Sequence, residues 1–280
     1  MTSHDLVALV RRQLPRKTKV GHLGTLDPAA AGVLPLAVGG ATKLIPLLPN
    51  LGGEMKGYIG HLRLGITTDT DDLEGEILHR APRDAVAKIT REDLERKLFS
   101  FQGETEQIPP QVSAVKNKGK RAYELAREGT YVELKARRIQ INTLKLLEYD
   151  KQLGLYKIFM SCGSGTYVRS LARDLGTELG LGGALSFLLR THSGPFHLHE
   201  SLSIEECFRK GIAANLVASE FPFLNIPKID TLEKAEQKGQ ILNGDFRTDG
   251  LFRVRGGLVE SEASNPNQAI VVALFENEHY

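Results

Sequence analysis

The sequence predicts an α+β protein in which helices flank a sheet and a small β-rich domain follows. Three observations lead to this fold. Several segments have the apolar alternation or β-branched content of strands, namely residues 58–64, 139–147 and 155–160. Segments 3–14 and 167–179 instead place apolar residues at helical spacing. A linker bounded by prolines at 222–227 divides the chain, so we expect domains at residues 1–222 and 223–280.

The first elements are expected to be a helix, a strand and a second, brief helix. Ser3 is placed to cap the first helix, and Pro15 ends it. Residues 33–38 have the composition of a strand. Because proline cannot donate a backbone hydrogen bond, Pro35 puts this strand near a sheet edge or a bulge. Residues 42–48 are expected to be helical.

The next strand leads into an acidic turn. Tyr58, Leu62 and Leu64 alternate along it, so they face one side of the sheet. The acidic run at 69–76 lacks the ligand and the glycine that an EF-hand loop requires at its fifth and sixth positions. We therefore expect a turn in which aspartate side chains accept hydrogen bonds from local amides, followed by a strand at 77–79.

The later elements are defined by capping signals and a hairpin. Capping boxes predict a helix at 91–99, starting after Thr90, and another that starts after Ser203. Residues 109–115 are expected to be extended and 122–127 helical. Two strands joined around 151–154 would deliver Gly163 and Gly165 to the end of the sheet.

Arg169 would lie near the N-terminus of the helix at 167–179, where the helix dipole disfavours a cation. It therefore needs a partner such as the buried carboxylate of Asp27. The alternative is a surface arginine whose head group stays in water.

Composition excludes several classes of protein. The hydrophobic content of 41% is ordinary, no apolar run approaches the length of a membrane span, and no secretory pattern begins the chain, so we expect a cytoplasmic protein. Cys162 and Cys207 form no CxxC or Cys/His cluster, and we interpret Cys162 as a packing residue. No Walker loop, dinucleotide fingerprint or zinc-deaminase signature is present. We therefore expect no cofactor and no metal, and no feature indicates a protein partner.

A basic segment from Lys116 to Arg138 is a candidate for binding a polyanion. It holds eight basic residues against three acidic ones, whereas the net charge of the whole chain is +2. The alternative is a merely solvated surface, and Gly119, Tyr123 and Tyr131, which lie between the charges, weaken that alternative.

The segment Gly21–Pro28 is the strongest candidate for a catalytic loop. Gly21 and Gly24 permit positive φ and the close approach of a bulky ligand, and Pro28 disfavours a helical conformation at Asp27. The carboxylate of Asp27 would then sit on a constrained loop, which suits a nucleophile. From these residues alone, the alternative is that Asp27 caps a helical segment at 29–31.

Together with later segments, this loop resembles the central motif of the TruB family of tRNA pseudouridine synthases. The match comprises Gly-His-x-Gly-Thr-Leu-Asp-Pro from Gly21, Gly-Val-Leu-Pro from Gly32, Gly-Gly-Ala-Thr-Lys ending at Lys43, Lys56-Gly-Tyr58, Asp69-Thr-Asp71, Pro109-Pro110 to Lys116, Gly119 to Tyr123, and Gly165-Thr-Tyr-x-Arg-Ser-Leu171. The resemblance extends to about residue 200. It implies a mixed, mainly antiparallel sheet of the pseudouridine synthase catalytic type, with flanking helices and a PUA-like C-terminal domain.

The resemblance also implies a function and site residues. The reaction would be the isomerisation of uridine 55 in the T-loop of tRNA to pseudouridine, which requires no metal, redox equivalent or ATP. Asp27 would be the nucleophile, Arg169 its ion-pair partner, and Tyr58 a residue that stacks on the target nucleotide or takes a proton from it. The expected substrate contacts are His22, Lys43, Lys116, Lys120, Arg121, Tyr167, Leu171 and Leu188. His22 has the alternative of a buried structural role, and Tyr167 that of a core residue.

Two other functions stay open. A guide-dependent rRNA pseudouridine synthase shares the core motifs, although the short C-terminal domain argues against it. A non-catalytic tRNA chaperone would use the same surface but would require neither Asp27 nor Arg169. Family members also carry a strand before the segment that begins here at Thr2, so we expect this sequence to lack the N-terminal strand of the family.

Overall fold

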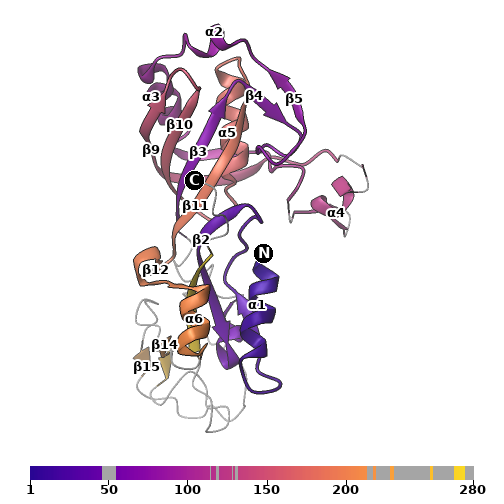
Figure 1. The fold of residues 1–280 in the computed structure, drawn as a ribbon, viewed down its shortest axis with the longest axis vertical. Coiled ribbons are helices and arrows are strands. Elements are labelled where there is room, and N and C mark those ends of the chain that lie inside the picture. The colour runs from indigo at the N-terminus through magenta and orange to yellow at the C-terminus, as the bar shows by residue number, and fades with distance from the viewer. Residues whose placement is uncertain are drawn as a thin grey trace. The chain divides into compact units, whose positions relative to one another are not determined.

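The computed structural model describes residues 1–45, 55–113, 115–117, 120–127, 129, 132–212, 217–218, 228–229, 253–254 and 268–274. The chain forms two compact units. The first unit comprises residues 1–54 and 192–280, and the second comprises residues 55–191. Both combine helices with mainly antiparallel strands (Figure 1), which confirms the α+β class. The expected linker at 222–227 and most of the residues after it lie outside the described ranges, so the PUA-like domain stays a prediction.

Strand β2 (Ala30–Val38) is the centre of the first unit. Strand β1 (Val20–His22) pairs antiparallel with residues 36–38 of β2, and β17 (Gln268–Leu274) pairs antiparallel with residues 32–38. The other described elements of this unit are α1 (Ser3–Arg12), η1 (Gly39–Leu44), β12 (Phe196–His197), η3 (Leu198–Glu200), β13 (Leu202–Ser203), α6 (Ile204–Lys210), β14 (Val217–Ala218), β15 (Lys228–Ile229) and β16 (Arg253–Val254). Strand β13 pairs parallel with β17, so the pairing is mixed.

The core of the first unit follows from the alternation of side chains along β2. Leu34 and Leu36 are fully buried and pack with Leu6 and Val10 of α1. Val33 points to the other face, where it packs with Phe196. Because both faces of β2 are covered, its residues form a nearly continuous apolar run.

The expected cap of the first helix and the alternative interpretation of Asp27 as a helix cap are both wrong. The N-cap of α1 is Thr2, not Ser3, because the Thr2 side chain accepts a hydrogen bond from Asp5 N and Asp5 reaches back to the backbone of Thr2. Residues 29–31 form no helix, since β2 already begins at Ala30. Asp27 therefore does not cap a helix there.

Pro35 also lies in a different setting from the one expected. It belongs to a nine-residue strand, and it sits opposite Val271 of β17 without a register shift. Its carbonyl accepts a hydrogen bond from Leu23 N at 2.9 Å. The strand is thus neither an edge strand nor bulged at this point, because a proline loses only the donor and keeps its acceptor. The first residues of the brief helix expected at 42–48 belong to the 3₁₀ helix η1 (Gly39–Leu44), and residues 46–48 lie outside the described ranges.

The second unit contains a sheet whose strand order is β11-β3-β10-β9-β6. Its elements are β3 (Lys56–Leu64), β4 (Ile66–Thr68), β5 (Ile77–Arg80), α2 (Arg83–Val86), α3 (Arg91–Ser100), β6 (Gly103–Gln107), β7 (Lys116–Asn117), β8 (Lys120–Arg121), α4 (Ala122–Arg127), β9 (Arg137–Asp150), β10 (Leu155–Cys162), α5 (Val168–Glu178) and β11 (Gly183–Ser193), the last of which continues into the first unit. The predicted hairpin is confirmed as β9 and β10, and both predicted capping boxes are present.

Helix α5 covers one face of β3. Tyr58, Leu62 and Leu64 are all buried on that face, as the alternation predicts. Gly60 lies between them, and a Cβ there would stand 3.3 Å from Val168 Cγ1 of α5, so the glycine allows the helix to approach closely. Across the part of the chain that the structure describes, no helix is both long enough and apolar enough to span a membrane.

Gly176 packs the end of α5 directly against the start of β11. A Cβ at this position would overlap the backbone of Gly182 and Gly183. The Gly176 carbonyl also accepts hydrogen bonds from the amides of Leu181 and Gly182, both at 3.0 Å. The end of the helix is therefore held directly against the turn that follows it.

We expect Gly176→Ala to lower the free energy of unfolding by about 2–3 kcal/mol, because backbone atoms cannot yield to the added methyl group. The loss should appear although alanine favours helix over glycine by about 1 kcal/mol. Gly163→Ala is the control, since its Cβ would stand an ordinary 3.7 Å from Gln140 Cβ. Urea denaturation of both variants measures the difference, and equal stabilities would contradict the close approach.

Candidate active site

Asp27 lies half-buried on a tight turn between β1 and β2. Its carbonyl accepts a hydrogen bond from Ala30 N at 2.9 Å, and Pro28 takes the second position of the turn, which its fixed φ favours. Gly24 has a φ of 109°, a conformation that other residues rarely adopt. The backbone on both sides of Asp27 is thus fixed by local geometry.

Ser3 anchors this loop from helix α1. The Ser3 residue is 2% exposed. Its Oγ accepts a hydrogen bond from Leu26 N at 3.0 Å and donates one to the Leu26 carbonyl at 3.4 Å. Leu26 is itself only 4% exposed. The residue that precedes the carboxylate is therefore held both by a buried hydroxyl and by the core.

The other two site candidates of the first unit flank this loop in sequence. His22 ends β1, and its ring meets that of His4 edge-to-face with centroids 5.2 Å apart. Lys43 lies in η1, and its side chain is outside the described residues.

The second unit holds the apolar candidates in its core. Tyr58 on β3 and Leu188 on β11 are each 8% exposed, and Leu171 on α5 is fully buried. Tyr167 precedes α5, and Gln107 holds its backbone by accepting from its N–H at 2.8 Å and donating to its carbonyl at 3.1 Å. Its ring packs against the cluster of Val115, Ala122 and Leu134, which favours the core interpretation of Tyr167.

Arg169 is 5% exposed near the N-terminus of α5. Its Nη1 donates to the Thr70 carbonyl at 3.2 Å, and its Nη2 donates to the Val112 carbonyl at 3.0 Å. Nη1 also lies 3.6 Å from Oδ2 of Asp72. These acceptors offset the unfavourable helix dipole and fix the plane of the guanidinium group. Asp72, whose side chain is 19% exposed, thus gives Arg169 a partly buried carboxylate within this unit, while the predicted pairing with Asp27 stays a prediction.

One helical turn later, Arg173 binds the neighbouring aspartate. Its Nη1 lies 2.8 Å from Oδ2 of Asp71, and its Nη2 donates to the Ile108 carbonyl at 2.8 Å. Asp71 has a φ of 62°, so its backbone is in the left-handed region. Burial raises the pKa of Asp71 above its usual 3.8, and the guanidinium groups of Arg173 and Arg169 oppose that rise.

The acidic turn at 69–76 is also fixed from within. Asp69 Oδ1 accepts from Glu76 N at 2.7 Å, and Asp72 Oδ1 accepts from Glu74 N at 3.1 Å, as the sequence predicts. The turn is joined to β11 as well, through Leu73 N to the Leu185 carbonyl and Leu185 N to the Asp71 carbonyl, both at 2.9 Å. Arg169 and Arg173 therefore bind a rigid structure.

The basic segment begins as a two-stranded hairpin. Lys116 lies on β7, and Lys120 and Arg121 lie on β8, with helix α4 following directly. The side chains of these three residues are outside the described set. Further along, Arg137 and Arg138 are exposed, and Arg138 Nη1 lies 3.7 Å from Glu104 Oε1.

Cys162 is confirmed as a packing residue. It is fully buried, and burial raises the pKa of its thiol to about 11, so it is not a thiolate at neutral pH. Within the described ranges, no three or more His, Cys, Asp or Glu residues gather as metal ligands would.

The structure thus assembles only part of the predicted site. Asp27 and His22 belong to the first unit, whereas Tyr58, Arg169 and Leu188 belong to the second, so contacts across this division stay predictions. Sequence reasoning missed the positioning residues Ser3, Asp71, Asp72 and Arg173. One sequence pattern could have indicated Asp71, Asp72 and Arg173. It consists of two arginines four residues apart on a predicted helix together with two adjacent aspartates that could pair with them.

We expect Arg173→Met to lower the free energy of unfolding by about 2 kcal/mol at pH 7, because it leaves Asp71 buried without its nearest counter-charge. The pKa of Asp71 should then rise further. An acid whose pKa is higher in the folded than in the unfolded state loses folding stability as the pH rises through these values. The loss should therefore shrink as the pH is lowered from 7 to 4.

Lys97→Met is the matched control for this prediction. It breaks the pair between Lys97 Nζ and Glu178 Oε2, which is also short at 2.7 Å, but whose side chains are 38% and 49% exposed. Its effect should stay below about 1 kcal/mol at either pH. Equal losses of unfolding free energy in the two variants, measured by urea titration, would refute the role assigned to Arg173. A loss in the Arg173 variant that does not change with pH would refute it as well.

Comparison with known proteins identifies the family of this chain. A family model described as the N-terminal domain of TruB family pseudouridylate synthases matches residues 11–168. The tRNA pseudouridine synthase B of Carboxydothermus hydrogenoformans is 43% identical over 277 residues, which cover 96% of this chain and 94% of that protein. The protein of the same name from Syntrophomonas wolfei is 43% identical, with 87% and 80% covered.

A solved structure, described as a Cbf5-Nop10-Gar1 complex, contains a similar fold. It is 27% identical to this chain with a TM-score of 0.53, and the match covers 73% of this chain and 49% of that one. The mixed sheet with flanking helices is therefore that of the pseudouridine synthases. Taken with the match of the family model over more than half of the sequence, this shows that the chain belongs to the TruB family of pseudouridylate synthases.

Proposed function

We propose that this protein isomerises uridine 55 in the T-loop of tRNA to pseudouridine. The observation that carries the proposal is a carboxylate, Asp27, on a turn fixed by hydrogen bonds to Ala30 N and through Leu26 to Ser3, in a member of this enzyme family. Two relatives that this chain matches over most of their length are named tRNA pseudouridine synthase B, and this name supports tRNA as the substrate.

The reaction is an exchange of one glycosidic bond for another. The bond from C1′ of the ribose to N1 of uracil breaks, the uracil turns, and C1′ bonds to C5. The proton on C5 leaves and N1 gains one, so the balance requires no oxidant, metal or nucleotide. Catalysis therefore requires a carboxylate at the reacting centre, a fixed cation that keeps it ionised, and a closed pocket that retains the detached uracil.

We assign these roles to predicted site residues. Asp27 is the nucleophile and Arg169 is its ion-pair partner, since a guanidinium held by two carbonyls keeps its orientation while a carboxylate changes its charge distribution. Tyr58 stacks on the target nucleotide or takes its proton. Leu171 and Leu188 form the apolar wall, and His22 contacts the extruded nucleotide.

The T-arm of tRNA is the proposed partner. Its folded loop would be recognised by shape and phosphate contacts, and the target base must leave the stack to be reached. Lys43, Lys116, Lys120 and Arg121 are the proposed phosphate contacts, and Tyr167 is assigned a part in the lining of the pocket only where its ring is not taken up by the core cluster. Lys116, Lys120 and Arg121 come from a short hairpin, an element suited to reaching along a nucleic-acid backbone.

A guide-dependent enzyme is the second candidate, favoured by the match to a chain from a Cbf5-Nop10-Gar1 complex. It is the weaker candidate, because that chain is 27% identical whereas the relatives named tRNA pseudouridine synthase B reach 43%. A tRNA chaperone would keep its RNA-binding activity when Asp27 is replaced, which distinguishes it from both enzymes.

Incubation of the purified protein with an unmodified tRNA transcript, without other proteins, guide RNA or cofactor, tests the proposal. Mapping of pseudouridine should locate the product at position 55. No product with the protein alone, but product after a guide RNA is added, would favour the second candidate. Binding without any product would favour the chaperone.

We expect Asp27→Asn to abolish turnover, by at least about 10³-fold, while tRNA binding changes by less than about 3-fold. The amide keeps the size of the side chain but cannot act as the nucleophile. Asp84→Asn, an exposed acid on α2, is the control and should keep full activity. A few per cent of residual turnover in the Asp27 variant, measured in single-turnover assays, would rule out the nucleophile assignment.

Arg169→Lys should lower turnover by about 10²-fold with little change in tRNA affinity. Lysine keeps the charge but cannot bond both the Thr70 and Val112 carbonyls while facing a carboxylate. Arg91→Lys, which alters an exposed arginine paired with Glu95, is the control. Rate, affinity and melting temperature should be measured together. Unchanged turnover would show that Arg169 is not the partner of the catalytic carboxylate.

A further inference from the structure

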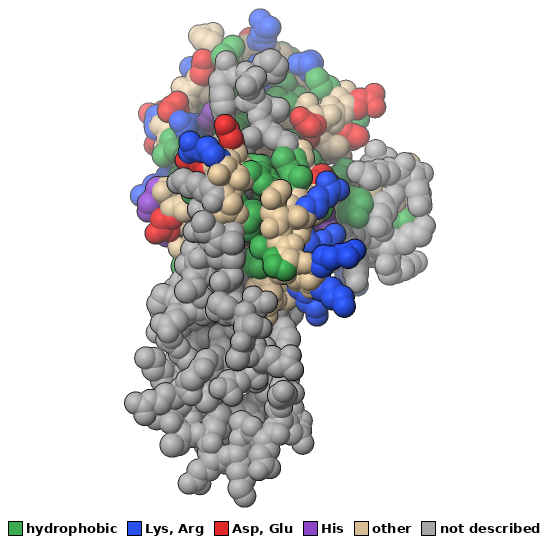
Figure 2. Space-filling view, turned by 60° about the horizontal axis from the view of Figure 1, so that its bottom comes forward, with side chains coloured by type: hydrophobic (Ala, Val, Ile, Leu, Met, Phe, Trp, Pro, Cys, Tyr) green, Lys and Arg blue, Asp and Glu red, His purple; other side chains and the backbone are tan. Residues whose placement is uncertain are grey.

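A second basic surface lies on the first unit, at the end of α1 and in the loop that leads to β1. The residues concerned are Arg11, Arg12, Arg16, Lys17 and Lys19, here called the α1–β1 basic loop. All five are exposed, and the stretch from Arg11 to Lys19 contains no acidic residue. Figure 2 shows Lys and Arg side chains gathered together on one face of the described surface.

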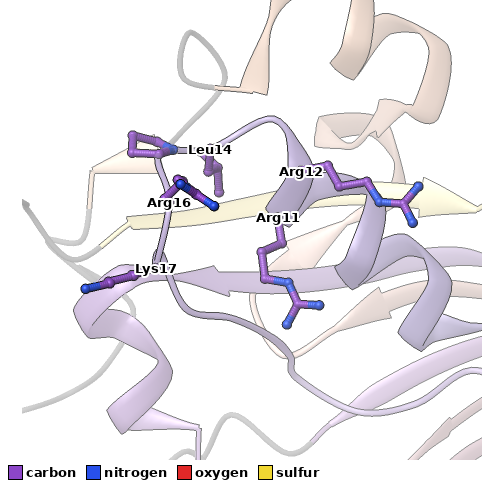
Figure 3. A pocket seen from close by; sticks show the side chains of 6 residues that line it. Arg11, Arg12, Leu14, Arg16 and Lys17 are labelled. Carbon is purple, nitrogen blue, oxygen red and sulfur yellow. The ribbon is translucent and has the colours of Figure 1, made fainter.

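Two adjoining cavities open on this loop. The larger, of about 650 Å³, is lined by Arg11, Arg12, Leu14, Pro15, Arg16 and Lys17. The smaller, of about 420 Å³, shares Arg11 and Lys17 with it and extends to Lys19. Figure 3 shows the cationic side chains spreading from the helix end and the loop. Arg12 and Lys17 point in opposite directions, so the cations spread positive charge over a broad surface.

The loop is held in shape by its own backbone. Thr18 donates to the Pro15 carbonyl through both its N–H, at 3.1 Å, and its Oγ1, at 2.7 Å. The Lys19 carbonyl accepts from Gly39 N at 2.8 Å, which ties the loop to the end of β2. Lys17 has a φ of 74°, an unfavourable conformation for a residue with a side chain. Lys17 thus keeps an exposed cation at a backbone position where glycine would be less strained.

These charges are not neutralised within the described part of the chain. No carboxylate there forms an ion pair with any of the five. The negative end of the α1 dipole offsets part of the repulsion between Arg11 and Arg12, but it does not reach the loop beyond. A polyanion would relieve the rest.

The position of the loop excludes a part in the chemistry. Asp27 lies just before Ala30, the first residue of β2. Lys19 is hydrogen-bonded to Gly39, which directly follows Val38, the last residue of that strand. Eight strand steps of about 3.3 Å separate these ends by about 26 Å. A bound nucleic acid whose target base lies at Asp27 would therefore meet the α1–β1 basic loop with a part distant from that base.

We infer that the α1–β1 basic loop is a binding site for the phosphates of the substrate RNA, away from the nucleotide that reacts. The inference rests on the proposed function for the identity of the RNA. The lysine ammonium and arginine guanidinium groups would bind the phosphates, and this binding would not depend on the base sequence of the RNA.

The test compares the double variant Arg16→Gln/Lys17→Gln with Arg83→Gln/Lys88→Gln, which removes the same charge from exposed positions on and beside α2. With unmodified tRNA transcript, the first should raise Kd about 10-fold near 0.1 M salt. It should also flatten the slope of log Kd against log salt by about 1.5, and the control should match the wild type. An unchanged slope, or equal losses in both variants, would overturn the inference.

Turnover separates this inference from the proposed function. At saturating tRNA the double variant should keep its kcat and show only a raised KM, in contrast to Asp27→Asn. A kcat that falls as far as kcat/KM would overturn the inference. If the wild-type protein forms no pseudouridine, the proposed function fails, and the binding comparison still decides on the loop.

Lys17→Gly provides a check against misfolding. It removes the charge and also the backbone strain, so RNA binding should weaken while the melting temperature stays the same or rises. A lowered melting temperature together with weakened binding would mean that Lys17 serves the fold, which would overturn the inference.

Discussion

The burial of Arg169 is the constraint on which the second unit depends. A guanidinium group that is 5% exposed has lost most of its water, and this cost must be offset by acceptors in fixed places. Those acceptors come from the Thr70 carbonyl and Asp72 in the acidic turn and from the Val112 carbonyl in the segment before the basic hairpin. The burial of one side chain therefore joins three stretches of chain that the sequence separates widely.

The first unit fixes Asp27 by a different means. No buried charge is required there, because the turn is formed by Pro28, the positive φ of Gly24 and the hydroxyl of Ser3 on Leu26. Ser3 is available for this because Thr2 takes the capping role. The two groups proposed to act together are thus each made rigid by local interactions within their own unit, as preorganised catalysis requires.

Sequence patterns predicted the features that depend on residues close together in the chain. They failed for features that depend on contacts between distant segments. The alternation of Tyr58, Leu62 and Leu64 and the capping boxes at Thr90 and Ser203 express interactions within a few residues, and all of these were predicted correctly. The strand position of Pro35 depends on β17, more than 200 residues later, which local propensity cannot reveal. The pair of Arg173 and Asp71 likewise spans a separation of 102 residues. Most of the residues assigned to the site came from the family motif, and the residues that hold them in place came only from the structure.

Exposure divides the cations of this protein into two classes with different physical behaviour. At physiological ionic strength the Debye length is about 8 Å, so salt screens exposed charges such as those of the α1–β1 basic loop. Arg169 and Arg173 instead bond carbonyls and carboxylates at close range in largely buried surroundings, where mobile ions penetrate little. If the proposed roles are correct, salt can weaken the capture of a polyanion without disturbing the groups proposed to hold the reacting centre. This separation lets an enzyme bind a highly charged substrate, release its product, and keep one geometry at the site throughout.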